Sequence, residues 1–364
     1  MLPKSPTTSN PGTSTRMHPF EDYKAQINLM PRLAFSFPIS EDANFFAHYD
    51  ILVQRPATNT LATAVDYFYF TDNPGTVKNN PNLKPERTID YEVGFQQKLT
   101  ETSKLKVAAY YKEIRNWIQL RTFFPIPIIT QYTTYDNQDF GTVKGFSFEY
   151  ELRRTGNATL NANYTLQFAD GTGSDANSQR GLTSRGNLRT LFPLNYDERH
   201  RINLNFDYRF FREQTNIPKF LAKTGLNVQA IAVSGRPYTA RRTPLELGGS
   251  QTIGSINGAR KPWTFTVNAR IDKTIAFSKG AGLNIYCRVS NLLDRRNVLN
   301  VYSATGSPTD DGFIESSNGQ DKLRNIENSA REVESYLASY QWAILNPGFY
   351  TLPRRIYIGA IYNF

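Results

Sequence analysis

The chain has 364 residues, and it combines 13% aromatic residues with a mean hydropathy of -0.50. No stretch approaches the ~20 apolar residues of a membrane helix, which excludes a helical membrane protein, and the single cysteine, Cys287, excludes an intrachain disulfide. The formal net charge is +10, but the basic residues are spread among alternating segments and polar loops, so we expect no nucleic-acid partner.

Apolar and polar residues alternate along nearly the whole chain, which predicts β-strands. Ile89, Tyr91 and Val93, for example, alternate with Asp90 and Glu92. Segments of this kind, in chain order, are about 32–39, 44–54, 88–99, 104–118, 142–154, 158–168, 200–210, 223–234, 263–271, 282–292 and 353–364. Strands of roughly 9–11 residues suit a tilted membrane crossing, whereas strands of soluble sheets are typically about 5–6 residues long. The pattern predicts an all-β meander of about 11–12 antiparallel transmembrane strands.

The predicted connections alternate in length. Long polar loops cover about 55–87, 119–141, 169–197, 235–262 and 293–352, and short turns lie between them. Outer-membrane β-barrels sort their connections in this way, with short periplasmic turns and long extracellular loops. The final strand then runs towards the periplasm. Residues 1–31 lack the basic region and apolar run of a signal peptide, and we expect an extracellular loop remnant or a disordered tail there.

Each predicted strand has one face for lipid and one for the lumen. The residues expected to face lipid are Ile89, Tyr91, Val93, Leu160, Tyr164, Ile202, Leu204, Phe206, Phe265 and Val267. The residues expected to face the lumen are Glu92, Asn161, Asn163, Asn205 and Asn268. Aromatic girdles are expected at both membrane interfaces, with Trp117 and Trp263 at the outer one and Phe210, Phe277 and Phe364 at the inner one.

The last strand alternates strictly and ends on an aromatic residue. Its apolar face consists of Ile356, Ile358, Ala360, Tyr362 and Phe364. A strand of this kind closes an outer-membrane barrel, whereas chain termini of soluble domains are usually frayed and polar. On these residues alone, a buried last strand of a soluble sandwich is an equal alternative.

Four segments together resemble TonB-dependent outer-membrane receptors. Asn80-Pro81-Asn82-Leu83-Lys84-Pro85-Glu86, followed by Glu92 and Gly94, is similar to the family's N-x-N-L-x-P-E … E-x-G segment. Ser234-Gly235-Arg236-Pro237-Tyr238 resembles its S-G-x-P-Y loop, and Asn291-Leu292-Leu293-Asp294, with Asn297 and Tyr302, resembles its N-L-x-D … N exit from the penultimate strand. Phe364 matches the outer-membrane assembly signal. The aromatic segments 35–38 and 45–49 resemble receptors of the Bacteroidetes type.

The resemblance implies a barrel of about 22 strands that is plugged by an N-terminal globular domain. Because it covers only about 80–364, it implies that residues 32–364 form the C-terminal barrel half. In such a receptor, a nutrient ligand such as a siderophore, a glycan or a peptide binds between loops and plug, and the TonB complex energises its uptake. The implied partners are outer-membrane lipid and lipopolysaccharide, the missing plug and barrel half, the TonB complex and the barrel-assembly machinery.

The sequence offers little sign of catalysis or of a cofactor. His18, His48 and His200 have no metal-site spacing, so we expect no metal, no cofactor and no enzyme. Segment 197–200, Asp-Glu-Arg-His, leaves an outer-membrane barrel enzyme as an alternative, beside a porin of ten to twelve strands and a soluble binding sandwich. The basic residues of one loop are expected to be solvated, and the ligand-binding residues stay unknown. These loop residues are Arg236, Arg241, Arg242, Arg260 and Lys261.

Overall fold

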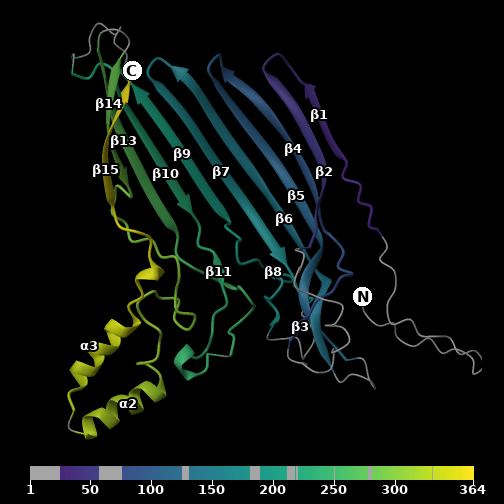
Figure 1. The fold of residues 1–364 in the computed structure, drawn as a ribbon, viewed down its shortest axis with the longest axis vertical. Helices are drawn as coiled ribbons and strands as arrows, with labels where there is room; N and C mark the ends of the chain where they lie inside the picture. Colours follow the sequence, from purple (N-terminus) through teal and green to yellow (C-terminus); the bar gives the residue numbers. More distant parts are fainter. Residues whose placement is uncertain are drawn as a thin grey trace, which may run out of the picture.

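The structure, a computed structural model, describes residues 25–56, 76–124, 131–180, 189–210, 218, 220–249, 251–277, 281–329 and 331–364. Eleven strands follow one another in chain order across a single antiparallel, open sheet (Figure 1). They are β1 (Arg32–Pro38), β2 (Ala43–Gln54), β4 (Glu86–Thr100), β5 (Ser103–Phe123), β6 (Tyr132–Thr155), β7 (Ala158–Gly171), β9 (His200–Arg209), β10 (Thr224–Val233), β13 (Thr264–Ala276), β14 (Gly282–Ser290) and β15 (Arg355–Asn363). This meander confirms the predicted fold class and excludes a sandwich of two packed sheets.

Several short strands and helices lie at one end of the sheet. β3 (Val77–Lys78) pairs in parallel with β6, and β8 (Phe192–Pro193) pairs with β7. β11 (Pro237–Tyr238) and β12 (Ala259–Arg260) form a separate ribbon. The helices α2 (Ser317–Asn328) and α3 (Val333–Ile344) project from the connection between β14 and β15, and 3₁₀ turns cover Leu245–Leu247 and Pro347–Phe349 (Figure 1).

Within the described residues, no helix is both long enough and apolar enough to cross a bilayer.

The connections are sorted by length, as predicted. The short turns lie at the end of the sheet where β15 ends, and the long connections with both helices lie at the opposite end (Figure 1). We call these the turn end and the loop end. Residues 1–24 of the predicted N-terminal segment lie outside the described residues, and 25–31 are extended.

The pairing register keeps the apolar residues of all strands on one face. Phe206 lies opposite Val228, and Val228 lies opposite Ala269. The row continues from Ala269 through Val289 to Ile356 at the sheet edge. All residues predicted to face lipid share this outward face. An outer-membrane barrel needs such a face along its whole circumference, because lipid surrounds it.

The opposite, inward face carries the polar residues of the same strands. Asn161 lies opposite Asn205, Asn205 opposite Gln229, and Gln229 opposite Asn268. The residues predicted to line the lumen therefore do share one face. The exposed fractions of the outward residues vary along the strand, since Val93 is 49% exposed while Ile89, nearer the loop end, is 7% exposed.

Aromatic rings mark both ends of the outward face. At the loop end, the ring of His200 stacks between Tyr164 and Trp263, with centroid distances of 6.2 and 5.6 Å. At the turn end, the ring centroid of Tyr362 lies 6.5 Å from that of Phe277 and 6.3 Å from that of Phe364. The rings of Phe210 and Tyr208 pack edge to face, with their centroids 5.0 Å apart. Rows of this kind correspond to the predicted girdles.

Trp117 departs from the predicted girdle. It lies at the loop end of β5, after a bulge at which Asn116 has a φ of 59°. Its ring packs against the buried cluster of Val143, Ala169 and Leu194. The bulge inserts an extra residue, and this turns the Trp117 side chain away from the outward face.

Two further differences concern the long loops. Much of the predicted loop 119–141 is strand, because β5 continues to Phe123 and β6 begins at Tyr132. The extension is rich in polar residues, so its sequence does not alternate between apolar and polar positions. Thr122 on β5 and Thr133 on β6, for example, form a polar pair with their hydroxyl groups 2.9 Å apart. The predicted loop 293–352 contains α2 and α3. Ser316 caps the first turn of α2 by accepting from the N–H of Gly319 at 3.1 Å.

Candidate ligand-binding site

The first family-like segment fastens the connection between β2 and β4 to the sheet. Asn80, only 8% exposed, donates to the Tyr135 carbonyl at 2.8 Å and accepts from the N–H of Asn82 at 2.9 Å. Leu83 and Pro85 follow between this turn and the start of β4. These residues form a strap across the extended part of β6, and none of them points to ligand chemistry.

The strap continues into the first residue of β4. The N–H of Lys84 donates to Asn137 Oδ1 at 2.6 Å, and Asn137 Nδ2 donates back to the Lys84 carbonyl at 2.9 Å. Glu86 accepts from the N–H of Ile118 at 3.2 Å. The reciprocal bonds satisfy the backbone groups of Lys84, and Glu86 satisfies the N–H of Ile118 beside the bulge in β5.

Glu92 and Gly94 lie lower in β4 on the inward face. Glu92 is 3.5 Å from the ammonium group of Lys106 on β5. A Cβ at Gly94 would lie 2.6 Å from the ring of Phe46, so the glycine lets that ring lie flat on the strand. This half of the motif therefore shapes the barrel wall.

The segment from Ser234 to Tyr238 locks the loop after β10. Ser234 accepts from the N–H of His200 through its Oγ at 2.9 Å, and its own N–H donates to the His200 carbonyl at 2.8 Å. A Cβ at Gly235 would lie 1.5 Å from the carbonyl oxygen of Lys261. Glycine is thus required by the close approach of two loops.

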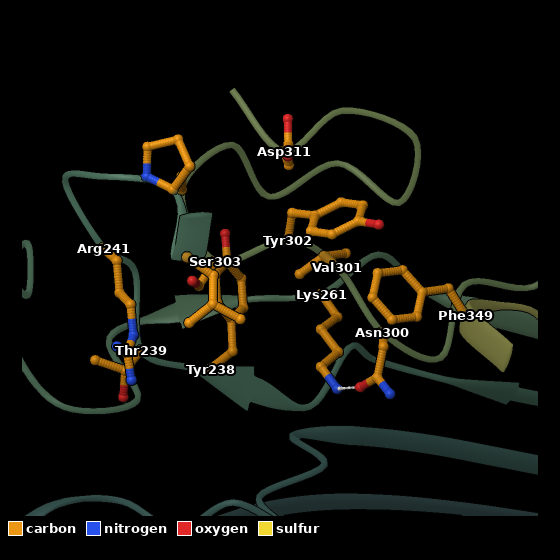
Figure 2. A pocket seen from close by; sticks show the side chains of 13 residues that line it. Tyr238, Thr239, Arg241, Lys261, Asn300, Val301, Tyr302, Ser303, Asp311 and Phe349 are labelled. Atoms are coloured by element: carbon orange, nitrogen blue, oxygen red, sulfur yellow. Dashed lines mark hydrogen bonds between the residues drawn. The ribbon is translucent and has the colours of Figure 1, made fainter. Parts of the chain in front are cut away.

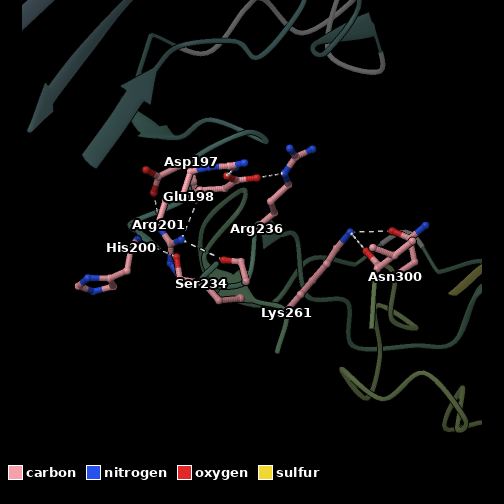
Figure 3. Close-up of polar contacts among 11 residues, drawn as sticks. Asp197, Glu198, His200, Arg201, Ser234, Arg236, Lys261 and Asn300 are labelled. Atoms are coloured by element: carbon pink, nitrogen blue, oxygen red, sulfur yellow. Dashed lines mark hydrogen bonds and ion pairs between the residues drawn. The ribbon is translucent and has the colours of Figure 1, made fainter. Parts of the chain in front are cut away.

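Two acidic residues between β8 and β9 hold the neighbouring loops together. Asp197, 1% exposed, accepts from the N–H of Ala169 at 3.0 Å and forms an ion pair with Arg260. Glu198 pairs with Arg201 and Arg236, each at 2.8 Å (Figure 3). Arg260, 27% exposed, is thus held by a buried carboxylate and is not simply solvated, whereas Arg236 is 59% exposed and remains largely solvated, as expected.

His200 has a structural environment. Its Nδ1 lies 2.9 Å from the hydroxyl of Tyr164, and its ring belongs to the outward aromatic row. Its neighbour Asp197 contacts the Ala169 N–H and Arg260 instead. Segment 197–200 therefore lacks the acid–histidine geometry of a hydrolase.

Asn291 and Asp294 build the exit from β14. Both adopt a left-handed conformation, with φ of 54° and 51°. Asn291, 6% exposed, donates to the Arg295 carbonyl at 3.0 Å, and Asp294 accepts from the N–H of Arg354 at 2.8 Å. The N–H of Leu292 donates to the Val267 carbonyl at 2.7 Å. The turn fixes where β15 begins.

The side chain of Asn297 forms hydrogen bonds with the backbone of β13. It is 1% exposed, accepts from the N–H of Phe265 at 2.8 Å and donates to the Phe265 carbonyl at 2.9 Å. The side-chain amide thus copies the hydrogen bonds of a neighbouring strand. The three family-like segments are therefore chiefly structural.

A cavity of about 450 Å³ opens among the loops that these segments position (Figure 2). Its lining includes the aromatic side chains Tyr238, Tyr302 and Phe349 and the cations Arg241 and Lys261. Tyr302 and Phe349 are 5.0 Å apart between centroids. Volumes of this size hold small-molecule ligands. This cavity is the best candidate for ligand contact in the described part of the chain.

Lys261 is the most constrained cation of this cavity. Its ammonium group donates to the Leu299 carbonyl at 2.8 Å and to Asn300 Oδ1 at 2.6 Å (Figures 2 and 3). Burial, and then the charge of Arg236, lower the pKa of Lys261. Of the cavity residues, sequence reasoning singled out only Tyr238, Tyr302, Arg241 and Lys261, and none of them as a ligand contact.

A buried polar network in the extended parts of β5 and β6 and the residues just after β7 has no counterpart in the sequence predictions. Gln119, fully buried, donates to Asp139 at 2.8 Å, and the Thr172 hydroxyl donates to the same carboxylate at 3.0 Å. Burial raises the pKa of Asp139, and it raises that of nearby Tyr196 to about 12. Because these partners lie far apart in the sequence, no local sequence pattern predicts the network.

No group of metal-ligating side chains forms in the parts of the chain that the structure describes. On β15, Ile356, Ile358, Ala360 and Tyr362 lie on the outward face, and Phe364 is fully exposed beyond them at the turn end. The role of these residues as an assembly signal stays a prediction.

A family model described as "TonB dependent receptor-like, beta-barrel" matches residues 7–292. No curated protein matches the chain significantly. Among solved structures, the outer membrane transporter YddB from Escherichia coli is 14% identical, with a TM-score of 0.50 over 73% of this chain and 37% of that chain.

Two receptors for iron compounds are similar in the same way. The ferric-catecholate import receptor Fiu from E. coli K12 is 15% identical over 73% of this chain and 31% of that chain, with a TM-score of 0.46. The FrpB iron transporter from Neisseria meningitidis is 12% identical over 74% of this chain and 35% of that chain, with a TM-score of 0.49. The chain spans about a third of the length of these proteins. Because the family model matches well over half of it, the chain belongs to the TonB-dependent receptor-like β-barrel family, whose members are outer-membrane transporters and not enzymes.

Proposed function

We propose that this chain is the C-terminal barrel half of a TonB-dependent receptor for the energised uptake of a nutrient ligand, such as a siderophore, a glycan or a peptide. The observation that carries the proposal is the continuous pairing of neighbouring strands from β1 to β15, whose register, apart from local bulges, keeps apolar residues outward and polar residues inward. A wall of this kind serves to separate lipid from a polar passage.

The loop cavity is the proposed point of first ligand contact. Tyr238, Tyr302 and Phe349 offer aromatic surface, and Lys261 offers a charge held in place by two acceptors.

The remaining partners follow from the same proposal. The outward face contacts outer-membrane lipid and lipopolysaccharide. The free edges of β1 and β15 pair with the remaining barrel half, and the inward face surrounds a plug through which the TonB complex acts. The barrel-assembly machinery inserts the protein. The aromatic segments near β1 and β2 support a receptor of the Bacteroidetes type.

The test uses cells that produce the full-length receptor containing residues 1–364. Accumulation of iron-loaded siderophores, glycans and peptides is compared in strains with and without a working TonB complex. We expect at least one ligand class to accumulate only with both the receptor and the complex. Receptor-dependent accumulation that does not need the complex would show a passive pore instead.

A pair of variants addresses the cavity in the same cells. Tyr238→Ala should lower uptake at subsaturating ligand, because Tyr238 lines the cavity. Trp342→Ala is the matched control, because Trp342 is an aromatic residue of the same loop end that is 77% exposed and outside the cavity lining. Equal effects of both substitutions would remove the cavity from the proposal.

A further inference from the structure

Charges on the inward face are balanced on most of the sheet and unbalanced on its last three strands. From β4 to β9, inward carboxylates are paired with cations of an adjacent strand or, for Asp207, with a cation of β6 on the far side of β7. These pairs are Lys112–Asp90 at 2.6 Å, Lys104–Glu151 at 2.7 Å, Arg154–Asp207 at 3.2 Å and Lys106–Glu92 at 3.5 Å. On β13, β14 and β15, the inward residues Arg270, Arg288 and Arg355 have no carboxylate of the described residues within ion-pair distance.

Tyrosine rings hold these three guanidinium groups in place. The Arg270 guanidinium lies 4.5 Å from the ring centroid of Tyr286. The ring of Tyr286 in turn covers Gly359, where a Cβ would lie 2.6 Å from Cζ of the tyrosine. Arg288 and Arg355 both lie over Tyr357, at 4.8 and 5.9 Å. Stacking fixes the planes of the guanidinium groups and leaves their N–H edges free.

The arrangement is unfavourable in the absence of an anion. Arg270 and Arg288 occupy directly opposed positions in the β13–β14 pair, and like charges so placed repel each other. The Nε of Arg270 is buried and lacks a hydrogen-bond partner. Asp272, two residues further along β13, lies 3.6 Å from Arg209 and accepts from Asn284. It is therefore engaged elsewhere.

A polar cavity of about 490 Å³ lies at the loop end of the same three strands. Thr266, Asn268, Ser290 and Arg355 contribute side chains to it, and none of its lining residues is acidic. Leu299 lines both this cavity and a second one that also contains Lys261 and the ion pair of Arg236 with Glu198. Lys261 and Arg355 thus place cations both among the loops and at the edge of the inward face.

We propose that the inward face of β13–β15, together with this cavity, binds a small anion that carries carboxylate or phosphate groups. The inference rests on the receptor function proposed above and names the ligand class, an anionic solute, that this wall receives. Arg355 makes the first contact at the cavity edge, and Arg288 and Arg270 bind the anion deeper in the lumen. Guanidinium edges suit both oxyanions, because they can donate two parallel hydrogen bonds.

The test measures binding of citrate and of inorganic phosphate to the purified full-length receptor in detergent by isothermal titration calorimetry. No energy source is needed, so the result does not depend on TonB-driven uptake. We expect citrate to bind and its affinity to fall with ionic strength. Arg270→Gln combined with Arg288→Gln should lower the affinity by at least about tenfold, the loss expected for charge-assisted hydrogen bonds.

Two further variants keep the test sharp. Arg355→Gln changes an exposed residue at the cavity edge, so it should preserve folding while lowering citrate affinity. Lys112→Gln is the control, because Lys112 is an inward cation on β5 that is already paired with Asp90 at 2.6 Å, and it should leave affinity within about twofold. The absence of citrate and phosphate binding, or equal affinity in all variants, would overturn the proposal. Unchanged affinity with a lowered melting temperature of the double variant would assign the arginines to carboxylates of a polypeptide in the lumen, and would likewise overturn it.

Discussion

Single residues at the loop end determine where the connections between strands meet. Gly235 allows the carbonyl oxygen of Lys261 to approach, and Asn297 replaces a strand beside Phe265. Asn291 and Asp294 supply the left-handed turn that ends β14, and Asp294 accepts from the N–H of Arg354 just before β15. These residue types recur in the family-like segments because backbone geometry and backbone hydrogen bonds require them, whatever ligand is taken up.

Gly235→Ala should destabilise the full-length receptor. The added Cβ would lie 1.5 Å from the Lys261 carbonyl oxygen, so two loops must move apart. We expect the free energy of unfolding in lipid vesicles, measured with guanidinium chloride, to fall by about 1–3 kcal/mol. Gly282→Ala is the control, since its Cβ would meet the nearest atom, the Ile275 carbonyl oxygen, at 3.6 Å. Equal losses for the two variants would contradict the close-approach explanation.

Lys261 should titrate below an ordinary lysine. Burial is the first cause and the charge of Arg236 the second, so the folded-state pKa lies below the ordinary lysine value of 10.5. A lowered lysine pKa means that folding favours the neutral amine, and stability linked to Lys261 rises as pH increases through the folded pKa towards 10.5. NMR of ¹³C-dimethylated receptor can follow the titration.

A comparison of variants separates the two causes. Arg236→Gln removes the neighbouring charge and should move the pKa of Lys261 upward, while burial keeps it below the ordinary value. Arg242→Gln is the control, because Arg242 belongs to the same loop but does not contribute to the shift. A pKa of Lys261 at or above 10.5 would refute the assigned environment.

At the scale of elements, alternation was sufficient to predict the strands that face lipid on one side. The pattern fails where both faces of a strand are polar, as in the extension of β5 and β6 around Thr122 and Thr133, which lies beyond the apolar band. It also fails for α2 and α3, because their helical faces are interrupted by polar residues within a segment that reads as a loop.

The candidate site was less accessible to sequence reasoning than the strands. Its lining comes from segments more than sixty residues apart, such as Tyr238 and Tyr302. Their proximity depends on the pairing of β10, β13, β14 and β15, which no local pattern reports. The same holds for Asp197 and Arg260, whose ion pair joins two loops that alternation leaves unassigned.

Opposite faces of β9 should respond differently to a new charge. Phe206 is outward, opposite Leu160 and Val228, whereas Asn205 is inward, opposite Asn161 and Gln229. Phe206→Arg should cost about 2–4 kcal/mol of folding free energy in lipid, because the charge enters the apolar band, and Asn205→Arg should cost much less. Reversible folding of the full-length receptor into phosphatidylcholine vesicles measures both. Similar costs would mean that the assignment of the two faces is wrong.

At the scale of the whole molecule, the chain has a turn end that would face the periplasm. Phe364 lies there, fully exposed and stacked on Tyr362. Deletion of Phe364 from the full-length receptor should lower the amount inserted in the outer membrane, because the assembly machinery would meet this end of β15. Ligand affinity of the inserted molecules should not change. Immunoblots of outer-membrane fractions and binding to intact cells provide the two measurements, and normal insertion with weaker binding would point to a ligand contact instead.

The count of strands in the meander has a geometric consequence for closure. Because neighbours are antiparallel and the described path has eleven members, β1 and β15 point the same way, from the loop end to the turn end. Joining these two edges directly would produce a parallel seam, the less stable kind of pairing. A complementary wall with an odd number of strands restores alternating directions at both seams, and a barrel of about 22 strands leaves such a number. Parity thus favours a partner wall over self-closure.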